Sequence, residues 1–227
     1  MKQKRIFYTE IAYVLGIITL AFGTALMERA NFGMSMVVAP AYLFHLKLSE
    51  YFPFFTFGMA EYMLQAVLLL ILTLAMRKFR ISYLFSFVTA VIYGFTLDLA
   101  LAAVGAIPFG GMVARTVYYL FGMVICSVGV AFFFHTYIAP EAYELLVSEI
   151  SRKYKFDTAK VKTVYDCTSC LVSIILSFSF FGFMHFEGIK LGTVFCALIN
   201  GWMIGIISKL MEKHLDFTDM LKRKDLT

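Results

Sequence analysis

Two long apolar segments that each contain an acidic residue constrain this chain more than any other feature. Residues 161–184 (VKTVYDCTSCLVSIILSFSFFGFM) are long enough to cross a bilayer and contain Asp166, and residues 56–76 contain Glu61 in the corresponding place. An ionised carboxylate in hydrocarbon is costly unless it is paired or hydrated, so such residues usually have a function. The two acids therefore indicate a membrane protein built from a duplicated unit.

The composition agrees with a membrane protein. The chain is 61% hydrophobic and only 15% charged, whereas soluble globular domains carry about 25% charged residues. Its 25 Phe and 13 Tyr suit lipid-facing surfaces and the membrane interface. The net charge of +5 does not indicate nucleic-acid binding, because the basic residues gather between the apolar segments.

The apolar segments define the expected topology. Crossing a bilayer takes about 20 residues, and six segments are long enough: 8–27, 53–76, 82–104, 112–137, 163–184 and 189–211. Residues 32–46 are apolar but too short, and Gly33 and Pro40 interrupt them, which predicts a half-helix. Residues 139–160 form a polar, amphipathic segment. We expect an all-α integral membrane protein with six transmembrane helices and short half-helices.

The distribution of Lys and Arg predicts the orientation. Most of these residues lie in the N-terminal start and in residues 77–80, 152–162 and 209–224. Basic loops remain on the cytoplasmic side. An arrangement of six spans with both termini in the cytoplasm places every one of these basic segments on the cytoplasmic side.

A weak internal repeat relates the two halves. Gly129 follows Gly23 by 106 residues, and Asp166 follows Glu61 by 105. Each half then contains a span, a short helix and two more spans. Because three spans is an odd number, the second half enters the membrane inverted, as in many secondary transporters. The predicted units are a first three-span repeat (1–107), a second three-span repeat (108–211) and a cytoplasmic tail (212–227).

Several short motifs resemble a known family. Gly23, residues 30–35 (ANFGMS), residues 57–58 (FG) and residues 93–98 (YGFTLD) resemble the YitT/YczE-type small bacterial integral membrane proteins, a largely uncharacterised family. The resemblance implies a topology rather than an activity. It implies a location in the bacterial cytoplasmic membrane.

Charged residues inside or beside the spans are the candidate site. Glu61 and Asp98 fall toward the outer half of the membrane, near Arg29 and Arg115 at span ends, and Asp166 falls toward the inner half. The structural alternative is that these residues form ion pairs between helices. The residues predicted to bind substrate or protons are Glu61, Asp98, Asp166, Arg115, Arg29, Tyr62, Met34 and Ser35.

Other chemistries have little support in the sequence. The four histidines are isolated and there is no P-loop, so no metal, cofactor or enzymatic activity is expected. Cys167 and Cys170 form a CxxC motif, which we interpret as packing residues. A thiol-redox membrane enzyme remains an alternative.

The sequence favours a small secondary transporter for an organic solute with cationic or aromatic character. Coupling of this transport to protons is a further expectation. One alternative is the substrate-binding membrane subunit of an ATP-driven uptake system, and another is an accessory protein for the maturation of a membrane complex. The expected partners are a small-molecule substrate and the lipid bilayer, with a second copy of the chain or an ATPase module as further candidates.

Overall fold

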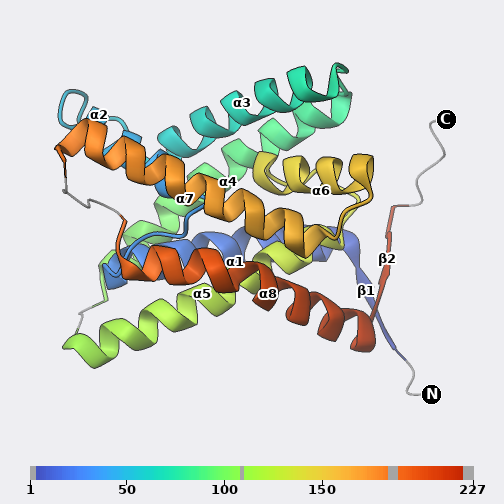
Figure 1. The fold of residues 1–227 in the computed structure, drawn as a ribbon. Helices are drawn as coiled ribbons and strands as arrows, with labels where there is room; N and C mark the ends of the chain where they lie inside the picture. The colour runs from blue at the N-terminus through green and yellow to red at the C-terminus, as the bar shows by residue number, and fades with distance from the viewer. Residues whose placement is uncertain (1–3, 108–109, 184–188, 222–227) are drawn as a thin grey trace.

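A computed structural model describes residues 4–107, 110–183 and 189–221 as an almost entirely helical bundle (Figure 1). Its long helices are α1 (Thr9–Ala30), α3 (Phe57–Met76), α4 (Ile81–Gly105), α5 (Met112–Phe134), α7 (Thr158–Phe181) and α8 (Leu191–His214). Two short helices lie between them, α2 (Ala39–Ser49) and α6 (Ala142–Tyr154). Each of these six helices has the length and the apolar composition needed to cross a membrane. The prediction of an all-α integral membrane protein is therefore confirmed.

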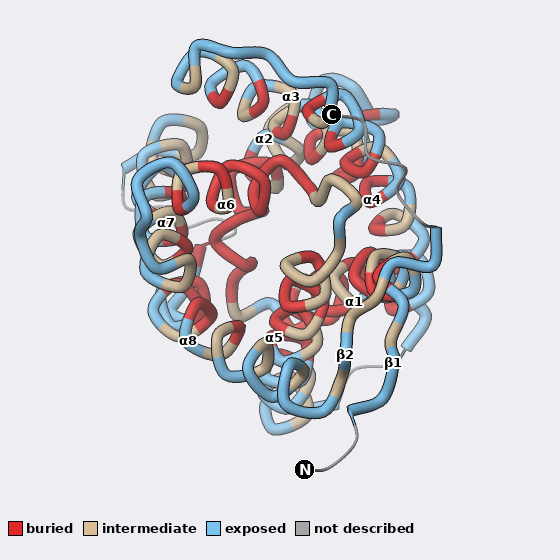
Figure 2. The backbone as a smooth tube through the Cα atoms, turned by 90° about the vertical axis from the view of Figure 1, so that its right-hand side faces the viewer, coloured by how far each residue is buried: buried red, intermediate tan, exposed pale blue. Residues whose placement is uncertain are grey.

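The bundle has apolar side chains on its outside and polar ones within. Leu74 is 76% exposed and Val113 is 79% exposed, whereas Gln65, Ser127 and Ser173 are completely buried. Figure 2 views the bundle along its length, and the buried parts of the long helices face its middle. Lipid tails can cover such an outer surface, because they are as apolar as the side chains that contact them.

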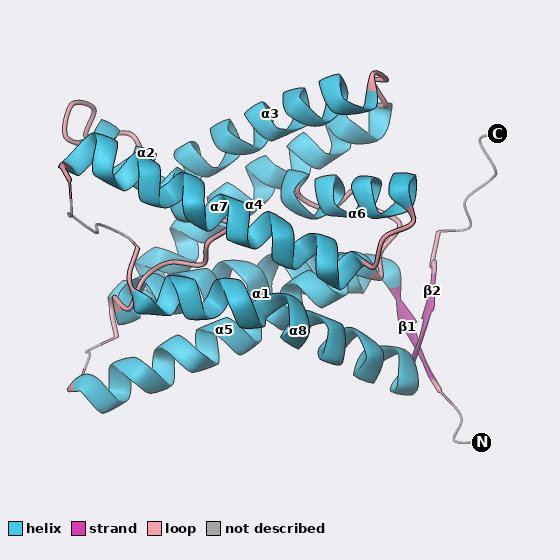
Figure 3. Cartoon of the chain, viewed as in Figure 1, coloured by secondary structure: helices cyan, strands magenta, loops and turns pink. Residues whose placement is uncertain are grey.

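The first and last described segments lie at the same end of the bundle. There β1 (Arg5–Tyr8) pairs in parallel with β2 (Leu215–Thr218), as Figure 3 shows. Glu10 accepts hydrogen bonds from the backbone N–H groups of Met220 and Leu221, both at 3.1 Å. We call this the terminal end of the bundle and the opposite one the far end.

Helix α7 begins five residues earlier than the sequence predicted. The side chain of Asp157 accepts a hydrogen bond from the Lys160 N–H at 3.1 Å, which is the usual bond of a helix N-cap. The predicted span at 163–184 left Lys162 in the basic loop before it. In the structure Lys162 lies inside the helix and is 1% exposed.

The two short helices enter the bundle from opposite ends. Both α2 and α6 pack against the same long helices, α3 and α7. The residues before α2, Ser35 and Val38, and the N-cap of α6, Glu141, line one internal cavity. The N-termini of α2 and α6 therefore meet inside the bundle, and each short helix runs outward from that point.

Candidate functional site

Five charged side chains meet where the short helices begin. Glu61 comes from α3, Glu141 and Glu144 from the start of α6, and Lys162 and Asp166 from α7. Each is at most 2% exposed. We call these five residues the central cluster. With four acids and one base, the cluster lacks enough positive charge to pair every carboxylate.

Lys162 forms the ion pairs of the cluster. Its Nζ lies 3.2 Å from Oδ1 of Asp166 and 3.5 Å from Oε1 of Glu144. Lys162 and Asp166 are four residues apart, so they share one face of α7. This face is turned toward the first turn of α6.

Gln65 fixes the start of α6 beside the cluster. It follows Glu61 by one helical turn, and its Nε2 donates to Oε2 of Glu141 at 2.8 Å. Its Oε1 accepts a hydrogen bond from the Ala142 N–H at 2.9 Å. The first N–H groups of a helix have no partner within the helix, so Gln65 satisfies one of them without water.

Glu61 is buried, and among the described residues its carboxylate makes no well-directed hydrogen bond. It is 0% exposed, and within the described part of the chain neither of its carboxylate oxygens has a hydrogen-bond partner. The side chains of Tyr143 and Gln65 lie close enough to interact with this carboxylate, but not in good hydrogen-bond geometry. A buried polar group without a partner costs free energy, so Glu61 is suited to receive a proton or a positively charged ligand.

Burial also changes the titration of the acids on α6, which lies outside the six long helices. Burial raises the pKa of Glu141 well above its ordinary value of 4.5, and the nearby carboxylates of Glu144 and Glu61 raise it further. Burial raises the pKa of Glu144 as well, although the ammonium group of Lys162 opposes this rise. These acids therefore hold protons to a higher pH than exposed carboxylic acids do.

A small cavity of about 20 Å³ lies against the cluster. Glu141, Glu144 and Lys162 line one side of it. Its remaining lining includes Thr24, Ser35, Tyr143, Cys126 and Asn200. A cavity of this volume holds about one water molecule. In this conformation the site is too small for an organic molecule.

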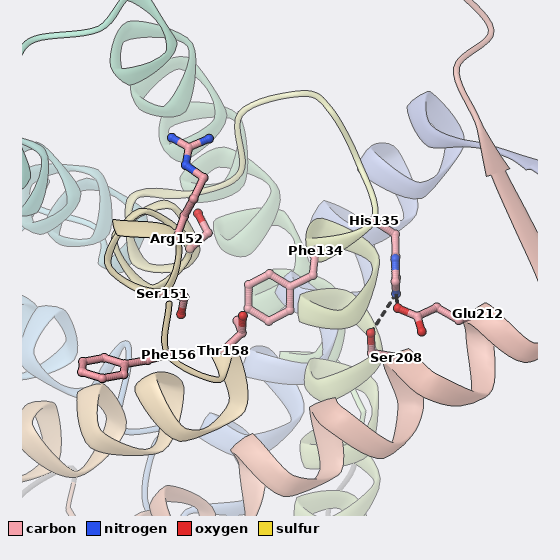
Figure 4. A pocket seen from close by; sticks show the side chains of 9 residues that line it. Phe134, His135, Ser151, Arg152, Phe156, Thr158, Ser208 and Glu212 are labelled. Carbon is pink, nitrogen blue, oxygen red and sulfur yellow. Dashed lines mark hydrogen bonds and ion pairs between the residues drawn. The ribbon is translucent and has the colours of Figure 1, made fainter. Parts of the chain in front are cut away.

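A larger hollow of about 500 Å³ opens at the terminal end (Figure 4). Phe134, Ser148, Ser151, Thr158 and Ser208 are among the residues that line it. His135 Nε2 lies 2.8 Å from Oγ of Ser208 and 3.8 Å from Oε1 of Glu212. We call it the terminal hollow.

One helical turn separates the terminal hollow from the central cavity. Ser148 of the hollow follows Glu144 of the cavity by four residues on α6, and Thr158 precedes Lys162 by four on α7. Four residues correspond to about 6 Å along a helix. The apolar side chain of Ile204, which is 3% exposed, lies midway between Asn200 and Ser208 on α8. Ile204, which packs with Val130 and Ala131, is therefore an apolar side chain between the two spaces on α8.

The structure brings three of the predicted residues to the cavity or cluster. Glu61 and Asp166 belong to the central cluster, and Ser35 lines the cavity. Met34 is 2% exposed and belongs to the neighbouring apolar core. Tyr62 follows Glu61 but packs near Gly94 of α4.

The other predicted residues lie at helix ends or bond to them. Oδ1 of Asp98 accepts a hydrogen bond from the Gly58 N–H at 3.0 Å, at the start of α3. Arg115 donates from Nε to the carbonyl of Ala30 at 2.9 Å, at the end of α1. Arg29 is exposed in the last turn of α1. A role for these three residues in binding stays a prediction.

Four residues of the site were missed from the sequence: Gln65, Glu141, Glu144 and Lys162. The segment 139–160 is polar in sequence, but the predicted internal repeat aligns it with the apolar half-helix at 32–46. That alignment was the available signal, because a counterpart of a buried half-helix is itself expected to be buried. In the structure Tyr143 and Val147 of α6 are at most 1% exposed.

In the described part of the chain, no group of three or more His, Cys, Asp or Glu side chains is arranged to hold a metal ion. Cys126, Cys170 and Cys196 are buried free thiols, and Cys167 is an exposed one.

Comparison with known proteins places the chain in a family. No curated protein and no solved structure matches it significantly. Residues 7–209, which include all five members of the central cluster, match the family of unknown function DUF6198. The match covers most of the chain, so the protein belongs to the family of unknown function DUF6198.

Proposed function

We propose that this protein is a small secondary transporter whose central cluster binds the solute and the coupling proton. The observation that carries the proposal is the buried, acid-rich cluster at the meeting point of two half-helices. Charged residues inside membrane bundles mark substrate or proton pathways. Broken or half-helices that meet inside the bundle are typical of transporter binding sites.

The crossing of α1 and α5 supports a build from two inverted repeats. A Cβ added to Gly23 would lie 2.7 Å from the Gly122 carbonyl oxygen, and one added to Gly129 would lie 2.9 Å from that of Gly16. Gly122 and Gly129 follow Gly16 and Gly23 by 106 residues each. The offset of 106 residues therefore converts the Gly16–Gly129 contact into the Gly23–Gly122 contact. Two equivalent contacts of this kind are what a two-fold axis between the repeats requires.

The two ends of the bundle differ at positions that the repeat relates. Ser148 and Ser151 line the open terminal hollow. Tyr42 and His45 precede them by 106 residues, and both pack on Phe57, with ring centroids at 5.3 and 6.0 Å. This asymmetry favours a carrier whose present conformation is open toward the terminal end and closed at the far end. The positive-inside rule supports a cytoplasmic location for the terminal end.

Proton coupling would use groups from several helices. Glu61 of α3 and Asp166 of α7 are the candidates that carry the proton. The titratable and charged groups that face them are Tyr93 of α4, Glu141, Tyr143 and Glu144 of α6, Lys162 and Tyr165 of α7, and Cys196 of α8. Two carboxylates in one low-dielectric site do not both ionise without cost. Entry of a cation would therefore favour release of a proton from the cluster.

The finer assignments remain proposals as well. Membership of the YitT/YczE-type group and a place in the bacterial cytoplasmic membrane stay predictions. The ATP-driven and accessory alternatives differ from a carrier in requiring a second protein. The thiol-redox alternative requires Cys167 and Cys170 to react together, and Cys170 is only 7% exposed.

The test begins with a thermal-shift screen of the purified protein against small amines, acids and vitamins. A solute that stabilises the protein is then offered to proteoliposomes that contain this protein alone and are preloaded with unlabelled solute. A carrier exchanges the unlabelled solute for external labelled solute without ATP. Binding without exchange, or exchange that requires an ATPase, would contradict the proposal.

A further inference from the structure

Lys162 holds a position that a bound cation could take. Its ammonium group is buried between Glu144 and Asp166, at 3.5 and 3.2 Å. Two other basic side chains of the bundle have partners elsewhere: the half-buried Arg115 bonds the Ala30 carbonyl, and the exposed Arg80 pairs with Glu149. Among these, Lys162 supplies the positive charge of the central cluster.

We propose that Lys162 is an internal substitute for the substrate. In the loaded carrier, the ammonium group of a small organic amine takes the place between Glu144 and Asp166 that the ammonium group of Lys162 occupies here. This proposal rests on the transport function above and assigns its substrate class. The solute is a primary amine with a short apolar chain.

The geometry of Lys162 allows its displacement. Its Nζ forms ion pairs, but within the described residues none of its N–H groups makes a well-directed hydrogen bond. Lysine offers three donors, so a ligand that can align its own donors competes effectively. In addition, a basic residue four positions before an acid is the weaker orientation of such a pair on a helix.

The displaced side chain has a place to go. Side chains on a helix lean toward its N-terminus, and for Lys162 that direction leads to Thr158 and the terminal hollow. The hydroxyl of Ser151, which also lines the hollow, is buried and has no hydrogen-bond partner in the described part of the bundle. It is available to accept a hydrogen bond from the displaced ammonium group.

The surroundings match a primary amine. The Nζ of Lys162 lies 5.5 Å from the centroid of the Tyr165 ring, and aromatic faces attract ammonium groups. Withdrawal of Lys162 would vacate the volume of its four-carbon stem, which adds to the cavity of about 20 Å³. Glu61, which makes no well-directed hydrogen bond among the described residues, supplies a third acidic group beside Glu144 and Asp166.

The test uses n-butylammonium, which reproduces the end of a lysine side chain. Its binding to the purified full-length protein is measured by calorimetry in the wild type, in Lys162→Gln and in Lys160→Gln. Lys160 is an exposed lysine on the same helix and serves as the matched control. We expect Lys162→Gln to bind about tenfold more tightly than the wild type, because the internal competitor is gone. Lys160→Gln is expected to match the wild type.

Equal affinity of the wild type and Lys162→Gln, or equally tight binding of butyrate, would overturn the proposal. If Lys162→Gln does not fold, Asp166→Asn is compared with Asp216→Asn, a change at an exposed position. Loss of butylammonium binding in Asp166→Asn alone supports the site, and unchanged binding refutes it.

Binding without transport contradicts the carrier function but leaves this site standing. Glu61-dependent transport of an anion or neutral solute contradicts this assignment alone.

Discussion

Gln65 and Glu141 connect a long membrane helix to the half-helix that completes the site. Nε2 of Gln65 donates to Oε2 of Glu141 at 2.8 Å, and the same amide accepts from the Ala142 N–H at 2.9 Å. The two bonds attach the polar start of α6 to α3 inside the bundle. The position of Glu141 and Glu144 in the central cluster therefore depends on a neutral side chain of α3.

Replacing Gln65 with Met should remove both bonds while keeping a side chain of similar size. Because two buried polar partners lose their hydrogen bonds, we expect the free energy of unfolding to fall by about 2–4 kcal/mol. Unfolding in detergent measures this change. Thr73→Val is the control, since the Thr73 hydroxyl bonds only within α3, to the Leu69 carbonyl among the described residues. Equal stability of Gln65→Met and this control would contradict the assigned role.

The stability of the protein should depend on pH through Glu141 and Glu144. Burial raises the pKa of both acids in the folded state, while the unfolded chain titrates near 4.5. Their cost to stability is thus absent below that value and grows as the pH rises toward the folded-state pKa. Glu141→Gln should flatten this fall, and Glu50→Gln, at an exposed position, should not. Unfolding measured across the acidic and neutral range would show either outcome.

Phe57 should help to close the far end. It is 3% exposed beneath Tyr42 and His45, whereas Phe54 is 69% exposed. Phe57→Ala should raise the rate at which a membrane-impermeant maleimide, added from the far end, modifies Cys126 in a protein without the other three cysteines. Phe54→Ala should leave this rate unchanged. A Phe57→Ala protein that remains folded and unreactive from that side would argue against this gate.

The cysteine pair should be dispensable. Replacing Cys167 with Ser and Cys170 with Ala removes one exposed and one small buried thiol. We expect solute exchange to persist and the unfolding free energy to fall by no more than about 1–2 kcal/mol. Loss of exchange in a folded double variant would instead support the thiol-redox alternative.

The sequence predicted the membrane spans well because their hydropathy alone determines them. Glu61 and Asp166 stood out for the same reason, as single acids in apolar segments. Helix α6 did not, because its Glu, Arg and Lys residues are also typical of a helix in water. Its burial depends on contacts with α3 and α7, which no local pattern records.

Lys162 illustrates the same limit at a single residue. In the sequence it belongs to a basic stretch that ordinarily marks a cytoplasmic loop. Because Asp157 caps the N-terminus of α7, the helix includes this stretch. Glu144 and Asp166 then compensate the positive charge of Lys162. Asp98 shows the opposite case. It is an acid inside a predicted span, as expected for a site residue, but in the structure it accepts a hydrogen bond from the Gly58 N–H at the start of α3 and lies outside the central cluster.

Proton flux that is driven by solute tests the central claim most directly. Proteoliposomes with a pH-sensitive dye inside would receive the solute found in the thermal-shift screen. The wild type and Glu50→Gln should both move protons when the solute is added. Glu61→Gln and Asp166→Asn should fold but show only the flux of protein-free liposomes. Solute-driven proton flux that continues unchanged in both cluster variants would contradict the central cluster as the transport site.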